Sequence, residues 1–595
     1  MVLFFLIPLG VLAQKYTGKR AEWFVHDRFG MFIHWGLYSG AEGYWKGEKL
    51  RYGNDYAEWI QYRNRIAKEE YLKLTDRFDW DKINPEEWVI LAKEAGMKYV
   101  TITAKHHDGF ALWNSASNDY NIYEHSKPKR DIIKELSAAC KKHGLKMGLY
   151  YSHWVDWEHP DGWDHTKEIY GIDQEAYDGY WQEKVIPQMR ELLTQYEDIG
   201  MIWFDMWFHH SETVVSKEQL VQIKELIREL QPDCLINSRL GLSVEEDSDV
   251  DFRTLGDNQL GKNKLEYPWQ TPATVAHSWG FHATENQWKS TSTLLRSLIG
   301  NVGLNGNFML NIGPRANGEV PYEIETRLKA MGDWLKTNGE AIYGSGAFDL
   351  PNDQHDWGLM TYKLTGEGTH KTFLHLFNWP LNKKLKVSGI VDQPRKIYLL
   401  ADKQKEPLNF DFNQAKITIA LPDKPMNQYV AVVVMEFDDK PQIERGLAAE
   451  LNAGGYSLDF NNTVSMNGET KIITPSRRGS IPRHINVDQP LTMRWNIFID
   501  KPGDYFFDTS YSNQATGSNG QIMVTVGNDK LIHQTKPTGK TVGEANNRWV
   551  IDNFASNRMG HINFGKSGFY DVELKLMSDL EKKFKWQWLW LEPIN

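Results

Sequence analysis

Short apolar segments alternate with amphipathic helical patterns from about residue 20 to residue 345, and this alternation is the feature that most constrains the fold. The segments have strand length and little internal alternation, which is typical of strands buried on both faces of a parallel sheet or barrel. Repeated strand–helix units over this length predict a (β/α) barrel resembling the TIM barrel. An open doubly wound sheet is the alternative, but no glycine-rich phosphate loop follows the first strand.

Six apolar runs mark the predicted barrel strands. They cover residues 30–34, 98–103, 146–151, 199–204, 234–238 and 307–312. Helix signals lie between them. Asn84-Pro85 begins one helix with a capping side chain and a proline, and Asp131 begins the next. The predicted α/β barrel domain therefore spans residues 20–345.

After residue 345 the helical patterns stop, and short strands with alternating apolar residues follow. This sequence pattern predicts an antiparallel β-sandwich over residues 346–440 and a second β-sandwich over residues 445–595. The tryptophan-rich end at 586–590 suits a carbohydrate-binding module, since indole rings stack on sugars. Packing of the same rings inside a sheet or against the barrel domain is an equal alternative.

Composition excludes several classes of protein. A net charge of −10 is unlike a nucleic-acid binder, which carries a basic face. Cys140 and Cys234 form neither a disulfide framework nor a zinc-spaced cluster. Residues 1–14 resemble the apolar core of a signal peptide, and no other run approaches membrane-spanning length. We therefore expect an exported protein, periplasmic or extracellular, without membrane insertion and without a cofactor. The oligomeric state is not indicated.

Polar and aromatic side chains follow five successive predicted strands. They are His34, then His106 and His107, then Tyr150, then Asp205, and finally Arg239. In a barrel, the carboxyl ends of the strands converge on one face, so these residues are expected to line one pocket. Each residue alone is more often structural than functional. The succession favours a site.

The chemistry of that site is narrowed by what the sequence lacks. His106 and His107 are adjacent and point apart if extended, which is poor for chelation, and no HExxH motif is present. The G-x-S-x-G elbow of serine hydrolases is also missing. Asp205, flanked by Trp203 and Trp207, suits attack on a sugar carbon. Retaining glycoside hydrolysis needs a second carboxylate as acid/base, from another loop.

Five segments together resemble the α-L-fucosidases of glycoside hydrolase family 29. They are Arg28–Gly36, Lys105–Phe110, Gly148–Ser152, Ile202–Asp205 and His277–Phe281. Their order and spacing match the family over about residues 20–345. The resemblance implies a retaining exo-glycosidase that hydrolyses terminal α-L-fucose from glycans through a covalent glycosyl-enzyme intermediate.

The resemblance also implies roles for individual residues. Asp205 is the expected nucleophile. Five side chains are expected around the fucose: His34, His106, His107, Tyr150 and Arg239. Trp45 and Trp279 are expected to shape the pocket beside the C6 methyl group or a neighbouring ring.

Two departures from the family pattern concern the acid/base and the substrate. Many relatives carry Trp-Glu-Thr where this chain has Gln270, so Asp257 is the favoured acid/base and Glu266 is the alternative. Tyr44 stands where relatives often have Glu, for which Glu42 or Glu58 is a candidate replacement. The alternatives to a fucosidase are a related glycosidase acting on a galactoside and a weakened, sugar-binding protein.

Overall fold

The computed structural model describes residues 18–50, 56–164, 171–351, 354–444, 447–452, 454–468, 472–473, 483–487, 489–514, 520–539, 553–577 and 584–594. The chain divides into two compact units, residues 1–347 and residues 348–595. The expected signal peptide, residues 1–14, lies outside the described residues. Within the described ranges, no helix has both the length and the apolar character needed to cross a membrane.

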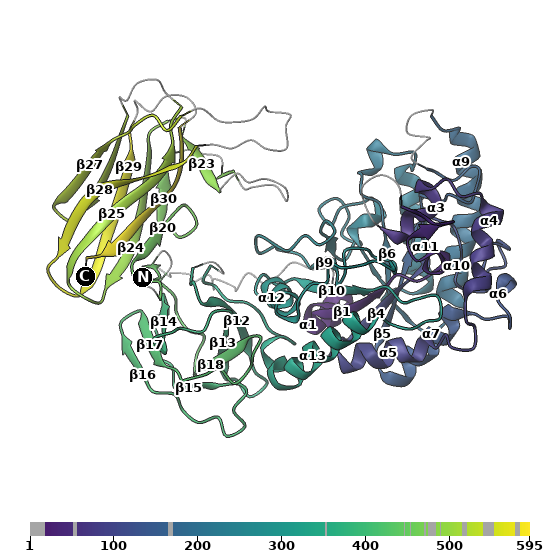
Figure 1. Ribbon diagram of the computed structural model, residues 1–595, viewed down its shortest axis with the longest axis horizontal. Helices are drawn as coiled ribbons and strands as arrows, with labels where there is room; N and C mark the ends of the chain where they lie inside the picture. The colour runs from purple at the N-terminus through teal and green to yellow at the C-terminus, as the bar shows by residue number, and fades with distance from the viewer. Residues whose placement is uncertain are drawn as a thin grey trace, which may run out of the picture. The chain divides into compact units, whose positions relative to one another are not determined.

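The first unit contains an eight-stranded parallel sheet, ordered β7-β6-β5-β4-β1-β10-β9-β8 (Figure 1). Its strands are β1 Phe29–Ile33, β4 Tyr99–Lys105, β5 Lys146–Tyr151, β6 Ile199–Phe204, β7 Leu235–Ile236, β8 Arg253–Thr254, β9 Trp269–Thr274 and β10 Asn307–Ile312. A parallel bridge between Asn237 and Phe252 joins the two edge strands, and the amide of Ser238 donates to Phe252 O at 2.9 Å. The sheet therefore closes, and the predicted barrel is confirmed.

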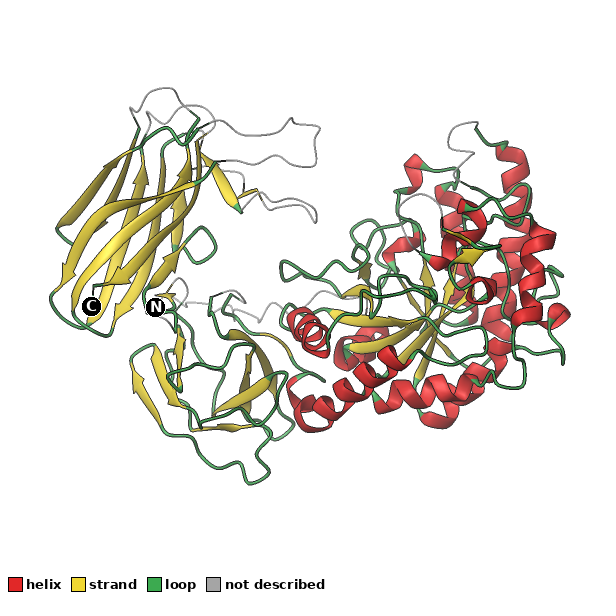
Figure 2. Cartoon of the chain, in the orientation of Figure 1, coloured by secondary structure: helices red, strands yellow, loops and turns green. Residues whose placement is uncertain are grey.

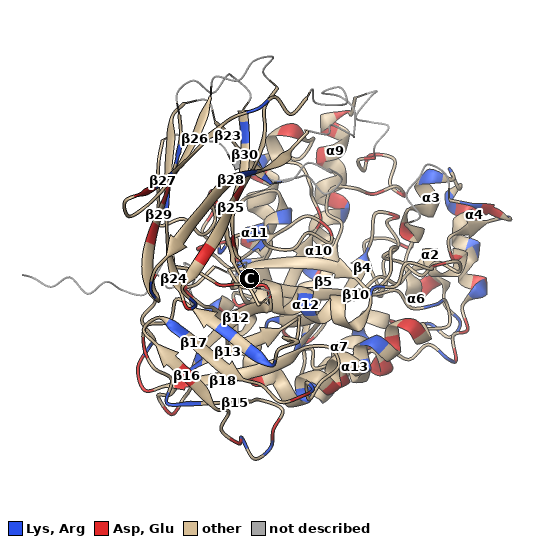
Figure 3. Cartoon of the chain, turned by 60° about the vertical axis from the view of Figure 1, so that its left-hand side comes forward, with Lys and Arg blue, Asp and Glu red and all other residues tan. Residues whose placement is uncertain are grey.

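Helices surround the strands in the first unit (Figure 2). They are α1 Glu22–Asp27, α2 Leu37–Ala41, α3 Ile60–Arg63, α4 Lys68–Leu72, α5 Pro85–Glu94, α6 Ile122–His125, α7 Ile132–His143, α9 Gln174–Tyr180, α10 Ile186–Thr194, α11 Lys217–Leu230, α12 Thr291–Val302 and α13 Tyr322–Asn338. The predicted caps hold, since the side chains of Asn84 and Asp131 accept from Glu86 N and Lys134 N. Acidic and basic residues are interspersed on these helices (Figure 3).

The late strand–helix units are irregular. Only the short helix η6 Ser238–Leu240 lies between β7 and β8, and no helix of the described residues lies between β8 and β9. The predicted strand at 234–238 is correspondingly short. The strand β7 ends at Ile236, and the side chain of Asn237 bonds the backbone of Phe204, accepting from N at 2.8 Å and donating to O at 3.0 Å. The segments between β7 and β9 are therefore mostly loops, and these loops can carry functional groups at the end of the barrel.

The second unit contains two β-sandwiches, as predicted, and their strand pairs are antiparallel apart from one short edge pair. The first pairs the sheet β12-β13-β18-β15 with the sheet β14-β17-β16. Its strands are β12 Gly358–Leu364, β13 His370–Leu376, β14 Lys384–Ser388, β15 Lys396–Leu399, β16 Phe410–Asn413, β17 Lys416–Ala420 and β18 Ala431–Phe437. Its apolar core includes Trp357, Leu374 and Val433.

The second sandwich packs the sheet β19-β24-β29-β26-β27 on the sheet β22-β23-β30-β25-β28. The strands are β19 Leu447–Ala448, β20 Tyr456–Leu458, β21 Ser465–Asn467, β22 Ile472–Ile473, β23 His484–Val487, β24 Leu491–Ile499, β25 Gly503–Ser512, β26 Gln521–Val526, β27 Asp529–Gln534, β28 Ala555–Phe564, β29 Gly568–Leu576 and β30 Phe584–Pro593. Trp586 lies in the core between the sheets, whereas Trp588 and Trp590 are only partly buried.

Candidate active site

Asp205 is the first residue after β6 and lies at the carboxyl end of the barrel. Its Oδ1 accepts a hydrogen bond from Arg239 Nη1 at 2.6 Å, and its Oδ2 accepts one from the Tyr150 hydroxyl at 3.0 Å. The carboxylate is 16% exposed. Each oxygen thus has a strong donor that fixes its orientation, and the group still reaches the pocket.

Arg239 joins Asp205 to a second carboxylate. Its Nη2 donates to Asp257 Oδ1 at 2.7 Å and to the carbonyl of Leu255 at 2.9 Å. Its guanidinium lies 5.1 Å from the centre of the Trp203 ring. Burial by itself lowers the pKa of Arg239, but the charges of Asp257 and Asp205 raise it above its ordinary value. A permanent cation therefore holds both carboxylates, and Asp257, at 42% exposed, is the outer one.

His34 and His106 are buried and neutral. Burial lowers the pKa of His34 to about 4. Burial, together with the neighbouring His107 and His34, lowers the pKa of His106 well below its ordinary value. Nδ1 of His34 lies 2.7 Å from Asn311 Oδ1, while the Asn311 amide donates to Trp279 O at 2.7 Å. With this amide orientation, Nδ1 of His34 carries the proton and Nε2 is the acceptor.

His107 is oriented by a hydrogen-bonded chain. The hydroxyl of Ser152 donates to Val155 O at 2.7 Å, so it accepts from Nδ1 of His107, also at 2.7 Å. This hydrogen bond places a proton on Nδ1 of His107. The other nitrogen, Nε2, lies 3.6 Å from Asp205 Oδ2. Neutral imidazoles with one accepting nitrogen are well suited to bind sugar hydroxyls.

An apolar wall lies beside these polar groups. Tyr150 and Trp203 are stacked with ring centres 5.6 Å apart, and Phe32 packs edge-on against Trp203 at 5.1 Å. Trp279 lies 5.1 Å from the His34 ring and 6.0 Å from Phe32. All four aromatic residues are buried. The wall is formed by side chains of four different barrel segments.

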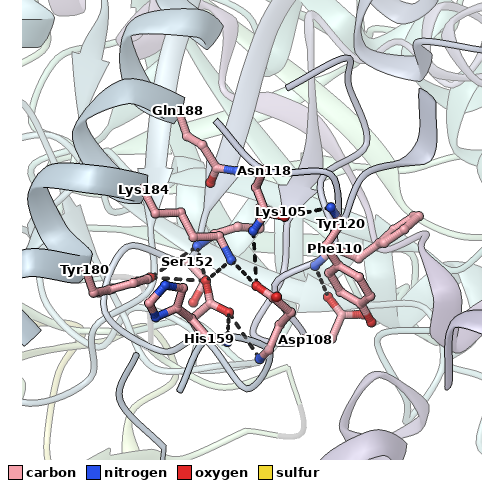
Figure 4. A network of polar contacts seen from close by, with 12 residues as sticks. Lys105, Asp108, Phe110, Asn118, Tyr120, Ser152, His159, Tyr180, Lys184 and Gln188 are labelled. Atoms are coloured by element: carbon pink, nitrogen blue, oxygen red, sulfur yellow. Dashed lines mark hydrogen bonds and ion pairs between the residues drawn. The ribbon is translucent and has the colours of Figure 1, made fainter. Parts of the chain in front are cut away.

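Buried charges support the histidine side of the pocket (Figure 4). Lys105, directly before His106, donates to Asp156 Oδ2 at 3.0 Å, and both side chains are fully buried. Lys184, in a π-helical turn between α9 and α10, contacts Asp156 at 2.8 Å and Glu158 at 2.5 Å. The amide of Trp157 donates to His107 O at 2.8 Å. The network therefore anchors the backbone next to the two histidines.

Seven of the predicted residues are brought together, since the rings of His34 and His106 also contact that of Tyr150, with centres 6.0 Å and 5.4 Å away. Trp279 joins them through His34. Trp45 is different. It lies in the hairpin of β2 Tyr44–Trp45 and β3 Glu48–Lys49, and its described ring contact is with Lys46 of the same hairpin. Tyr44 contacts Thr284 by its hydroxyl at 3.2 Å. Glu266 is exposed.

Gln270 is not positioned for acid/base chemistry. It is the second residue of β9 and is fully buried in the barrel. Its Oε1 accepts from Trp203 Nε1 and its Nε2 donates to the Tyr99 hydroxyl, both at 2.9 Å. Both ends of the amide are satisfied in the core, away from the carboxyl edge of the sheet. A carboxylate at this depth would also lie below the pocket.

Glu58 and Trp59 were not predicted as site residues, although Glu58 was considered as a replacement acid. Both lie in the short helix η2 Ala57–Trp59. Glu58 is buried, its Oε2 accepts from Gly280 N at 2.9 Å, and burial raises its pKa to about 7. Trp59 packs 5.5 Å from the ring of His107. The signal available in the sequence was an acid next to a tryptophan.

Two carboxylates held together at the carboxyl edge of a closed barrel are the arrangement that a retaining glycoside hydrolase requires. Residues 13–340 match the family model for alpha-L-fucosidase. The chain belongs to this family, glycoside hydrolase family 29.

Characterised relatives agree with this assignment. The alpha-L-fucosidase of Dictyostelium discoideum is 31% identical over 380 residues, which cover 59% of this chain and 79% of that protein. The crystal structure of an alpha-L-fucosidase from Vibrio sp. strain EJY3 is 26% identical, covers 98% of this chain and 99% of its own, and has a TM-score of 0.72. An alpha-L-fucosidase from Bacteroides thetaiotaomicron, trapped as a covalent intermediate with 2-fluoro-fucosyl fluoride, is 27% identical with a TM-score of 0.62. It covers 72% of this chain and 99% of its own.

Proposed function

We propose that the protein releases terminal α-L-fucose from glycans with retention of configuration. The observation that carries this proposal is the arrangement of Asp205 and Asp257 on one guanidinium, that of Arg239, at the carboxyl edge of the barrel. Retaining glycosidases need two carboxyl groups about 5–5.5 Å apart. Two carboxylates bonded to neighbouring nitrogens of the same group are held close enough for this pairing.

In the first step, Asp205 attacks the anomeric carbon of fucose. Asp257 donates a proton to the glycosidic oxygen as the bond to the leaving group breaks, giving an ester between Asp205 and the sugar. Arg239 occupies Oδ1 of Asp257, which leaves Oδ2 to carry the proton. In the second step, water attacks the anomeric carbon, Asp257 takes its proton, and the Asp205 carboxylate is regenerated. Two inversions give net retention.

The pocket provides recognition of the sugar by two kinds of surface. The accepting nitrogen of His34, Nε2 of His107 and the buried carboxyl of Glu58 are partners for hydroxyl groups. Nδ1 of His106 is buried and has no hydrogen-bond partner among the described residues, so a sugar hydroxyl there would satisfy it. The aromatic wall of Phe32, Trp203 and Trp279 suits the C6 methyl group of fucose, which stands where galactose has a hydroxymethyl group. Such a wall discriminates only modestly, by about 10–200-fold.

A weakened, sugar-binding protein is the less favoured alternative. The reason to consider it was the amide at Gln270, and this amide is a core residue bonded to Trp203 and Tyr99. Its presence leaves the pair Asp205 and Asp257 intact.

The test compares an aryl α-L-fucoside with the aryl β-D-galactoside. We expect wild type to hydrolyse the fucoside faster, with α-L-fucose as the first product seen by NMR. Azide should rescue Asp257→Ala as the fucosyl azide of retained configuration, because attack follows the covalent intermediate. It should rescue Asp205→Ala as the inverted azide, because only one displacement then occurs. Glu266→Ala is the matched control for the acid/base. No release of aglycone from either sugar by wild type would overturn the proposal.

A further inference from the structure

Two aromatic residues lie two and three positions after the proposed nucleophile and are exposed to solvent. Trp207 is 40% exposed and Phe208 is 38% exposed. Among the tryptophans in the described residues, Trp207 alone is exposed to this extent. An exposed indole in a loop at the end of a barrel strand loses hydrophobic stabilisation, so its position calls for a functional reason.

Trp207 is fixed to the wall of the pocket. Its ring lies 5.7 Å from the ring of His107, 6.4 Å from Trp59 and 4.8 Å from Trp154. Trp154 is fully buried, and its indole N–H donates to Asp205 O at 2.9 Å. One part of the Trp207 ring is therefore packed against residues that contact Asp205 or its neighbours, and the remaining part faces outward.

The loop that carries Trp207 is also tied at its far end. Nε2 of His209 lies 3.0 Å from Glu246 Oε1 in the loop after β7, and Nδ1 of His209 lies 2.7 Å from Ser211 Oγ. At the near end, the amide of Met206 donates to Arg239 O at 2.8 Å. Anchors on both sides give Trp207 and Phe208 a defined position relative to Arg239 and its two carboxylates.

Exposure rises from the floor of the pocket to its mouth. His34, His106 and Tyr150 are buried, whereas Asp257 is partly exposed and Trp207 is exposed. In the proposed reaction, Asp257 protonates the oxygen that joins fucose to the leaving group. The leaving group must then lie outward from that oxygen, towards solvent, and Trp207 and Phe208 are solvent-exposed rings in the loop that begins with the proposed nucleophile.

We propose that Trp207, together with Phe208, forms the subsite for the leaving group and that its occupant is a pyranose ring, the next sugar of the glycan. This inference rests on the proposed function. The apolar C–H face of a pyranose stacks on an aromatic ring, because both surfaces are apolar and are removed from water together.

The experiment uses two kinds of substrate with the full-length protein. α-L-Fucosyl fluoride has no ring in its leaving group, whereas α1,2-, α1,3-, α1,4- and α1,6-linked fucosyl-pyranose disaccharides do. The readout is the ratio of kcat/KM for the best disaccharide to kcat/KM for the fluoride, so that general damage to the pocket cancels. We expect Trp207→Ala to lower this ratio about 10-fold, mainly through KM, and Trp207→Phe to lower it less than about 3-fold.

Two further variants keep the inference falsifiable. Phe208→Ala should lower the ratio in the same direction if Trp207→Ala does not fold. Phe569→Ala, an exposed aromatic of the second sandwich at 44% exposure, is the matched control and should leave the ratio unchanged. An unchanged ratio in Trp207→Ala and Phe208→Ala overturns the inference. Hydrolysis of the fluoride but of none of the disaccharides by wild type also overturns it, whereas no turnover of the fluoride overturns the proposed function itself.

Discussion

Charged side chains are buried at the carboxyl edge of the barrel, whereas they are more exposed in the second sandwich. At the barrel edge, Lys105 and Asp156 form an ion pair that is fully buried. In the sandwich, Arg558 and Asp508 form a pair with side chains 47% and 17% exposed, and the core between the sheets is made of apolar and aromatic residues. Removing ions from water costs several kcal/mol per ion, so the buried pair must be held by geometry that the surface pair does not need.

This difference shows that side-chain positions are most constrained at the carboxyl edge of the barrel. The buried charges lie next to His106, His107 and Trp157, which line or support the pocket. The sandwich charges lie on a surface where solvent relaxes around any change. Substitutions in the two regions should therefore differ strongly in their effects, on activity and on stability.

The largest effect is expected for Asp205→Ala. Removing the proposed nucleophile should reduce kcat for an aryl α-L-fucoside at least about 10³-fold, because the covalent route is lost. The far-UV circular dichroism spectrum should stay that of the wild type. Activity within tenfold of the wild type would contradict the assignment of Asp205.

The next largest effect is expected for Lys105→Met. Asp156 would lose one of its two buried cations, and breaking a buried pair costs about 3–5 kcal/mol. The measurement is the free energy of unfolding of the barrel transition in urea, with kcat/KM for the fucoside as a second readout. A cost below about 1 kcal/mol would show that the network does not stabilise the edge.

Glu58→Gln should change how stability depends on pH. Burial raises the pKa of Glu58 to about 7 in the folded protein, whereas it titrates at its ordinary, lower value when unfolded. The native state thus binds the extra proton, and the stability from this group is present at acid pH and is lost as pH rises towards 7. The loss is about 3 kcal/mol.

The amide of the Glu58→Gln variant does not titrate, so its free energy of unfolding should fall less than that of the wild type between pH 5 and pH 8. Asp108, whose pKa burial also raises to about 7, is present in both proteins and cancels in the difference. Parallel curves for the two proteins would refute the role of Glu58.

The smallest effect is expected for Arg558→Ala in the sandwich. An exposed ion pair contributes about 0–1 kcal/mol, so the free energy of unfolding should change by no more than this. Hydrolysis of the fucoside should match that of the wild type. If this variant costs as much as Lys105→Met, the contrast between the two regions disappears.

Much of the barrel was predictable because its signals are periodic. The strands β5 and β10 begin and end at the predicted residues, and the caps Asn84 and Asp131 act as expected. Residues placed directly after parallel strands meet in space, which is why His34 and Asp205 were found together. The end of an apolar run marks the end of a strand, so the sequence identifies the residues that follow it.

Residues outside the strand pattern were harder to place. Glu58 and Trp59 come from a short helical turn with no period that ties it to the barrel edge. The partner of Lys105 lies 51 positions away in a loop, and sequence spacing does not reveal such a pair. Gln270 was compared with the acid/base glutamate of relatives because of the motif that it shares with them, and a motif does not give the depth of a residue in the barrel. The structure shows that it is a core residue.

The position of Gln270 has a consequence for how turnover can be altered. Its oxygen holds the indole of Trp203, the indole lies under the guanidinium of Arg239, and that guanidinium holds both carboxylates. A substitution at Gln270, or at Tyr99, which accepts from the other end of the amide, should therefore shift the indole, the guanidinium and the two carboxylates. A directed-evolution library that samples only the rim of the barrel would miss these two core sites, where selection can adjust the reacting groups without touching the sugar.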